Sequence, residues 1–191
     1  MREESDCSVL LLLSGGIDST ACLSLFRERG REVRALFIEY GQPAASKEEE
    51  AATAISLHYG TPLAILRCRG LGEIGKGFVL GRNAFFAHAA LMTFDNLAGL
   101  IVIGIHAGTM YADCTEHFLT IMQSSLDLYA DGRIVISAPF IRWDKRMIWD
   151  YCRAANVPLQ LTYSCELGKD QPCGKCLSCK DLEALYACEN Q

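Results

Sequence analysis

Residues 10–19 read LLLLSGGIDS, an apolar run that leads directly into a turn rich in serine and glycine. Four consecutive leucines predict a buried parallel strand, and the apolar positions from Ala21 to Phe26 predict a helix after the turn. Two adjacent glycines let backbone N–H groups face an anion with no Cβ in the way, and a helix N-terminus adds a favourable dipole. The stretch therefore predicts a phosphate-binding loop between a strand and a helix.

The side chains of this loop suit the phosphates of a nucleotide. Ser14 and Ser19 can donate hydroxyl hydrogen bonds to phosphate oxygens, beside the backbone of Gly15 and Gly16. An ionised Asp18 cannot donate to phosphate, so we expect it either to face a magnesium ion or to cap the helix. The Walker and Rossmann patterns are absent. The string resembles instead the PP-loop of ATP pyrophosphatases, which split ATP into AMP and pyrophosphate while they adenylate a substrate.

Strand and helix patterns alternate along most of the chain. Short runs rich in Val, Ile and Leu predict buried strands at 8–13, 32–38, 62–66, 100–105 and 133–137. Helical spacing lies between or after them, at 19–29, 46–59, 83–97, 115–129 and 145–155. This order predicts a three-layer α/β sandwich with a five-stranded parallel sheet, which is the adenine nucleotide alpha hydrolase-like fold that the PP-loop implies. We expect residues 1–160 to form this domain, with residues 161–191 as a C-terminal segment packed on it.

Composition narrows the classes of function. Half of the 191 residues are apolar, which suffices to bury one core without disulfides. The formal net charge of −5 argues against a broad cationic surface, so nucleic acid is not expected as a partner. The apolar run at 9–13 is too short for a signal peptide or a membrane span, so we expect a cytoplasmic protein that does not enter a membrane.

Four of the ten cysteines lie close together near the C-terminus. Cys165, Cys173, Cys176 and Cys179 give the spacing C-x7-C-x2-C-x2-C in a segment with almost no apolar side chains. Four thiolates at this spacing can complete a tetrahedral zinc shell, and metal binding would order the segment. An iron–sulfur cluster is the alternative metal reading. Because four protein ligands leave no open position for water, we expect a structural Zn²⁺ site.

Further short motifs occur in one order along the chain. They are EYGQ at 39–42, GRN at 81–83 and YADC at 111–114, between the phosphate loop and the terminal cysteines. Together they resemble the 7-cyano-7-deazaguanine synthase (QueC) family over nearly the whole chain. The resemblance implies an enzyme of queuosine biosynthesis that adenylates 7-carboxy-7-deazaguanine with ATP, couples it to ammonia and dehydrates the amide to a nitrile. Each activation releases pyrophosphate.

The resemblance also implies roles for individual residues. Ser14, Gly15, Gly16, Asp18 and Ser19 would hold ATP and its Mg²⁺, and Tyr40 and Gln42 would lie where nucleotide and substrate meet. Arg82 and Asn83 match the family's Gly-Arg-Asn, and Arg82 is also a suitable fork for phosphate or carboxylate. Lys145 would neutralise phosphate charge, unless it is only part of a solvated helix start. Asp113 and Cys114 match a substrate-side Asp-Cys pair, although Asp113 could instead cap a helix near 115. His88 and His106 are taken as ordinary residues.

Two segments depart from the family pattern. The loop at 104–114 has lost polar groups that the family usually carries there, and the segment at 66–81 is short. A smaller lid leaves a more open pocket, which could admit a protein amine in place of ammonia, as in QueC-like proteins of bacterial anti-phage defence operons. We favour ammonia as the nitrogen donor. A PP-loop tRNA thiolase and a non-catalytic ATP-binding module are the other classes considered, and a homodimer is plausible by family analogy.

Overall fold

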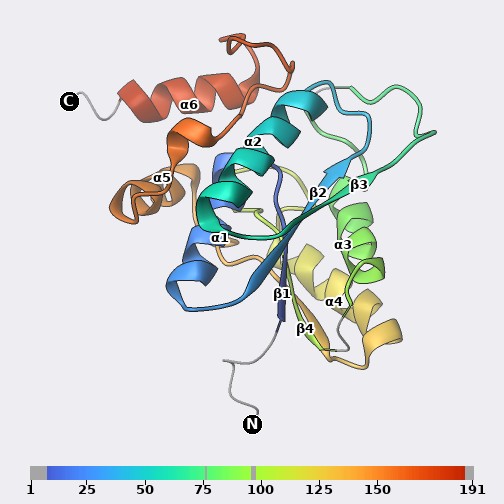
Figure 1. Cartoon of the computed structure of the whole chain (residues 1–191). Coiled ribbons are helices and arrows are strands. Elements are labelled where there is room, and N and C mark those ends of the chain that lie inside the picture. The colour runs from blue at the N-terminus through green and yellow to red at the C-terminus, as the bar shows by residue number, and fades with distance from the viewer. Residues whose placement is uncertain (1–7, 76, 96–97, 188–191) are drawn as a thin grey trace.

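The computed structural model describes residues 8–75, 77–95 and 98–187 and contains one parallel sheet of five strands (Figure 1). Cys7 and Cys188 lie outside the described residues. The strands are β1 (Ser8–Leu12), β2 (Val33–Glu39), β3 (Leu63–Arg67), β4 (Gly99–Val102) and β5 (Ile134–Ser137), in the order β3-β2-β1-β4-β5. The neighbours are all paired in parallel. The predicted fold class is therefore confirmed.

Helices cover both faces of the sheet. They are α1 (Ile17–Glu28), α2 (Ala45–Tyr59), α3 (Arg82–Met92), α4 (Glu116–Ala130), α5 (Lys145–Ala154) and α6 (Leu177–Ala187), with a short 3₁₀ helix η2 (Leu159–Leu161). In Figure 1, α1, α2, α5 and α6 lie on one side, and α3 and α4 lie on the other. None of the helices in the described part of the chain is long and apolar enough to cross a membrane.

The leucine run supplies both cores because alternate side chains of a strand point to opposite faces. Val9, Leu11 and Leu13 pack with α1, α2 and α5. Leu10 and Leu12 pack with α3 and α4 on the opposite face. β1 is thus buried on both sides, as its unbroken apolar sequence predicts.

The strand order places a ligand site at the end of β1. β1 lies between β2 and β4. The chain runs from β1 through β2 to β3 on one side, and continues with β4 and β5 on the other side of β1, so the strand order reverses here. Open α/β sheets bind ligands in the crevice at such a switch point, at the carboxyl ends of the strands. The turn at 13–16 and the loop that follows β4 both lie there. At Gly104, a Cβ would lie 2.8 Å from the backbone nitrogen of Ser19, so only glycine lets the loop after β4 approach the first turn of α1 so closely.

Some boundaries differ from the predictions. The helix after the phosphate loop has Gly16 as its N-cap, so the capping role considered for Asp18 is wrong. The helix predicted at 83–97 ends at Met92, because Thr93 closes it with bonds to the Ala89 and Ala90 carbonyls. Phe94 then packs into the core from outside the helix. The last residues of that predicted helix, 96 and 97, lie outside the described residues.

The apolar core between α4 and the sheet should contribute much of the free energy of unfolding of the protein. Leu126 is fully buried in the core on that face, whereas Leu128 on the same helix is 79% exposed. We expect Leu126→Ala to lower the free energy of unfolding by about 2–5 kcal/mol, because it leaves a cavity. Leu128→Ala is the matched control and should change it by less than about 0.5 kcal/mol. Urea unfolding followed by circular dichroism measures both, and equal effects of the two variants would contradict this packing.

Candidate active site

The phosphate loop is held in a fixed shape by its own serines. The Ser19 hydroxyl donates to the Gly16 carbonyl at 3.0 Å and accepts from the Ser14 backbone nitrogen at 3.2 Å. The two hydroxyl oxygens of Ser14 and Ser19 lie 3.1 Å apart. The loop and the first turn of α1 border a cavity of about 320 Å³. The predicted phosphate site therefore lies at a helix N-terminus that opens into a cavity, which is the arrangement that binds anions.

Asp18 and Lys145 meet at this end of the cavity although 127 residues separate them. The Lys145 ammonium donates to both carboxylate oxygens of Asp18, at 2.6 and 2.7 Å. Asp144 caps α5 by accepting from the Met147 backbone nitrogen, and this cap fixes the start of the helix that carries Lys145. Lys145 is therefore a cavity residue paired with Asp18, not only a solvated helix start.

His106 also faces Asp18, although the sequence analysis took it as an ordinary residue. Its Nε2 lies 3.8 Å from Asp18 Oδ2, and its Nδ1 accepts a hydrogen bond from the Gly108 backbone nitrogen at 3.0 Å. Burial lowers the pKa of His106, against the charge of Asp18, which raises it. With Nδ1 accepting, the neutral ring carries its proton on Nε2 and directs it toward Asp18. The available signal was the position of His106 just after β4, the strand next to β1.

Two aromatic rings and a guanidinium also line the cavity. Tyr40 and Phe86 lie edge to face with ring centroids 5.2 Å apart, and the Arg82 guanidinium lies 6.0 Å from the Phe86 ring. Within the described part of the chain, the buried Nε of Arg82 has no hydrogen-bond acceptor. A buried donor without a partner is costly, so this guanidinium suits an anionic ligand group.

Most of the predicted site residues border this one cavity. Asn83 also donates to the Asp113 carbonyl at 3.2 Å and so holds the 111–114 loop. Asp113 itself and Gly15 are not among the cavity's lining residues. The capping role considered for Asp113 is wrong, because Thr115 caps α4 by accepting from the Phe118 backbone nitrogen. The predicted residues brought together are Ser14, Gly16, Asp18, Ser19, Tyr40, Gln42, Arg82, Asn83 and Lys145.

The four predicted cysteines form a compact cluster. The Sγ atoms of Cys165, Cys173, Cys176 and Cys179 all lie within 4.8 Å of one another. A tetrahedral zinc ion with bonds of about 2.3 Å places its sulfur ligands roughly 3.8 Å apart. Backbone N–H groups of Lys175 and Cys176 donate to Cys173 Sγ and lower its pKa to about 6. The donor set and its spacing therefore fit a metal ion held by four thiolates.

The segment that carries these cysteines also forms a wall of the cavity. The Tyr163 backbone nitrogen donates to the Gly15 carbonyl at 2.9 Å, and Lys47 pairs with Asp170 at 2.8 Å. The Ser178 hydroxyl and backbone nitrogen both donate to Glu166 Oε1. The sequence did not single out the lining residues that this segment contributes, which are Tyr163, Ser164, Glu166, Ser178, Asp181, Leu182 and Leu185.

Two solved structures share the fold of this chain. A U34-tRNA thiolase NcsA from Methanococcus maripaludis aligns with a TM-score of 0.58 at 15% identity, over 97% of this chain and 66% of that one. An NMN synthetase from Francisella tularensis aligns with a TM-score of 0.52 at 14% identity, over 98% and 78%. At these identities the likeness concerns the fold alone. Together with the phosphate loop, the fold defines a PP-loop protein of the adenine nucleotide alpha hydrolase-like type.

Sequence comparison identifies the family. The model of queuosine biosynthesis protein QueC matches residues 8–77 and 68–187. The 7-cyano-7-deazaguanine synthase of Methanoculleus marisnigri is 33% identical over 196 residues, which cover 88% of each chain. That of Prochlorococcus marinus is 32% identical over 212 residues, covering 96% of this chain and 94% of the relative. The chain belongs to the QueC family.

Because the cysteine segment forms a wall of the cavity, loss of its metal should weaken nucleotide binding. We expect Cys176→Ser to lose the bound metal and to bind ATP at least about tenfold more weakly, while the sheet stays folded. Cys68→Ser, at a cysteine outside the cluster, is the control. Elemental analysis and calorimetric titration with ATP measure the two properties. Metal loss with unchanged ATP affinity would show that the segment does not support the cavity, and a variant that retains its metal would show that Cys176 is not needed as a ligand.

Proposed function

We propose that this protein adenylates 7-carboxy-7-deazaguanine with ATP and couples it to ammonia, giving 7-cyano-7-deazaguanine in queuosine biosynthesis. The observation that carries the proposal is one cavity that joins a PP-loop, the Asp18–Lys145 pair and the unpartnered Arg82 Nε in a QueC-family chain. Relatives that bear the synthase name match nearly the whole length of the chain.

The chemistry proceeds through two activations. A carboxylate oxygen of the substrate attacks the α-phosphorus of ATP and displaces pyrophosphate. Ammonia then attacks the acyl carbon, a proton leaves the nitrogen, and AMP departs to give the amide. A second ATP activates the amide oxygen, again with loss of pyrophosphate, and removal of the nitrogen protons with departure of AMP leaves the nitrile. No step needs a nucleophile from the protein, so its work is positioning and charge stabilisation.

Each end of the cavity has a part in the first activation. The loop hydroxyls and the N-terminus of α1 would hold the phosphates, and Lys145 would lie between Asp18 and the phosphate oxygens. Asp18 offers carboxylate oxygens of the kind that Mg²⁺ prefers, so it would hold the ion, which would offset the negative charge of the phosphates. Arg82 would hold the substrate carboxylate or the α-phosphate through the donor that has no protein acceptor.

Further parts of the proposal concern the metal, the state of association and the location. The four thiolates would hold Zn²⁺ as a structural ion, because they complete a tetrahedral shell. We also propose a cytoplasmic protein that works as a homodimer. The division at residues 160 and 161 stays a prediction, with the C-terminal segment bound to the phosphate loop through Tyr163.

One alternative to ammonia as the nitrogen donor, an amine of a partner protein, has an observation in its favour. The segments 66–81 and 104–114, which depart from the family pattern, lie side by side. Phe78 of the first stacks on Tyr111 of the second, with ring centroids 5.1 Å apart. Leu80 and Met110 on these same loops are largely exposed, at 88% and 103%. An exposed apolar rim suits a protein that brings its own amine to the adenylate, as in the anti-phage defence reading. Ammonia remains the proposed donor.

Lys145 provides the sharpest test of the activation step. We expect Lys145→Met to lower the rate of pyrophosphate release by about a hundredfold or more, because it removes the charge that faces the phosphates. Arg146→Met is the matched control: Arg146 is the next residue of α5, and its guanidinium pairs with Asp150 at 2.8 Å. That variant should keep the rate of the wild-type protein.

The assay supplies ATP, Mg²⁺ and 7-carboxy-7-deazaguanine with and without ammonium, and mass spectrometry identifies the products. Amide or nitrile formation supports the synthase, and an adenylate that accumulates despite ammonium points to the protein acceptor. ATP binding without any pyrophosphate release would reject the proposal in favour of a binding module.

A further inference from the structure

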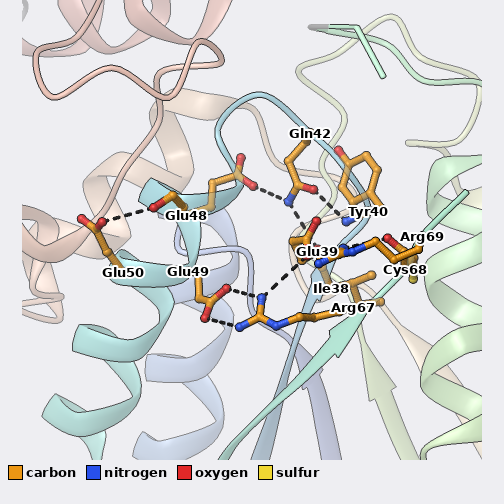
Figure 2. A network of polar contacts seen from close by, with 11 residues as sticks. Ile38, Glu39, Tyr40, Gln42, Glu48, Glu49, Glu50, Arg67, Cys68 and Arg69 are labelled. Atoms are coloured by element: carbon orange, nitrogen blue, oxygen red, sulfur yellow. Dashed lines mark hydrogen bonds and ion pairs between the residues drawn. The ribbon is translucent and has the colours of Figure 1, made fainter. Parts of the chain in front are cut away.

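Gln42 borders the cavity, but its hydrogen bonds are committed to the protein. Its Oε1 accepts from the Tyr40 backbone nitrogen at 2.9 Å, and its Nε2 donates to the Ile38 carbonyl at 3.3 Å and to Glu48 Oε2 at 2.9 Å (Figure 2). The Tyr40 N–H requires an oxygen and the Ile38 carbonyl requires a donor, so the amide can adopt only this orientation. Both amide hydrogens are used, and Gln42 has no donor left for a ligand.

Glu48, in contrast to Gln42, still has hydrogen-bonding capacity for a ligand. It lies in the first part of α2 and borders the same cavity, and one of its oxygens bonds to Gln42. The other oxygen keeps its capacity to accept hydrogen bonds. Burial raises the pKa of Glu48, against the hydrogen bond from Gln42 and the charge of Arg82, which lower it. A partly buried carboxylate is costly unless donors surround it, and a ligand can provide the missing donors.

The surroundings of Glu48 restrict the ligand group that can lie there. A carboxylate repels phosphate, and no lysine among the described residues pairs with the Glu48 side chain as Lys145 does with Asp18. The polyphosphate of a nucleotide would therefore be held by the loop hydroxyls, the N-terminus of α1 and Lys145 rather than by Glu48. Tyr40 and Phe86 line the same cavity as Glu48 and supply aromatic atoms against which a flat ligand can pack. A fused heterocycle with an exocyclic amine combines the flat ring with the N–H donors that the carboxylate needs.

We infer that Glu48 is a base-reading residue, which accepts a hydrogen bond from the exocyclic amine of a purine-type base, and that Gln42 positions it. Two bases of this chemistry enter the cavity under the proposed function. ATP carries an amine at C6, and 7-carboxy-7-deazaguanine carries an amine at C2 beside its N1–H. The second source rests on the proposed function, whereas the first requires only that the protein binds ATP.

The test compares each base with its counterpart that lacks the amine. The nucleotide pair is ATP and purine riboside triphosphate, and the substrate pair is 7-carboxy-7-deazaguanine and 7-carboxy-7-deazahypoxanthine. Affinities are measured by calorimetry for wild-type protein and for Glu48→Gln, with a non-hydrolysable ATP analogue present for the substrate pair. The variant keeps its bond to Gln42 through the amide oxygen, so its amide NH₂ faces the ligand amine and cannot accept from it. Glu50→Gln, an exposed residue of the same helix, is the control.

We expect the wild-type protein to bind the amine-bearing member of one pair about tenfold or more tightly than its counterpart, as for a hydrogen bond to a charged group. In Glu48→Gln this preference should disappear, and in Glu50→Gln it should remain. The pair that shows the effect identifies the base. A purely structural Glu48 would weaken both members of a pair equally, and that result for both pairs would overturn the inference.

The proposed function is tested separately by pyrophosphate release from wild-type protein. If 7-carboxy-7-deazaguanine triggers release but Glu48→Gln alters no preference within either pair, the proposed function stands and the role of Glu48 is rejected. If no release occurs and only the nucleotide pair shows the effect, the proposed function fails and Glu48 reads adenine.

Discussion

The cavity depends on one position that has no room for a side chain. Gly15 has a φ of +79°, and a Cβ there would lie 2.6 Å from the Glu48 carbonyl oxygen and 2.9 Å from the Ala51 Cβ. The Gly15 carbonyl meanwhile accepts the Tyr163 N–H. Gly15, a residue of the phosphate loop, is thus the point at which the loop after β1, α2 and the C-terminal segment meet. A larger residue would move α2 outward, and Glu48 would move away from the cavity with it.

Charge is divided unevenly along the cavity. Its lining holds four carboxylates, on Asp18, Glu48, Glu166 and Asp181, against two cations, on Lys145 and Arg82. A bare polyphosphate would meet net repulsion from these side chains, which the backbone N–H groups of the loop and a divalent cation would offset. This balance supports the proposed Mg²⁺. It also explains why Lys145 bonds to Asp18 in the structure, since each offsets the desolvation of the other where their side chains are only 28% and 22% exposed.

The sequence predicted those parts of the molecule that depend on local pattern. The leucine run, the Gly-Gly turn and the spacing of apolar residues predicted five strands in the right places and the loop that joins β1 to α1. Cys173, Cys176 and Cys179 are close in sequence, and only Cys165 had to be brought in from a short distance. The rest depends on the order of the strands. His106 faces Asp18 because β4 pairs with β1, and Glu48 borders the cavity because Gly15 lets α2 approach. Neither contact leaves a periodic signal in the sequence.

The C-terminal segment links the cysteine cluster to the cavity at the phosphate loop, two sites that lie far apart in the sequence. Cys165 is a residue of the metal cluster, and Tyr163, two positions earlier, bonds to the phosphate loop. Ser178 and Cys179 are neighbours on α6, the first lining the cavity and the second belonging to the cluster. A state in which the segment is disordered therefore loses the metal ligands and a cavity wall together. A metal ion and a nucleotide that each bind only the ordered segment would raise the affinity for one another by the same factor. The metal site is in this sense part of the nucleotide site, although none of its sulfurs needs to contact a ligand there.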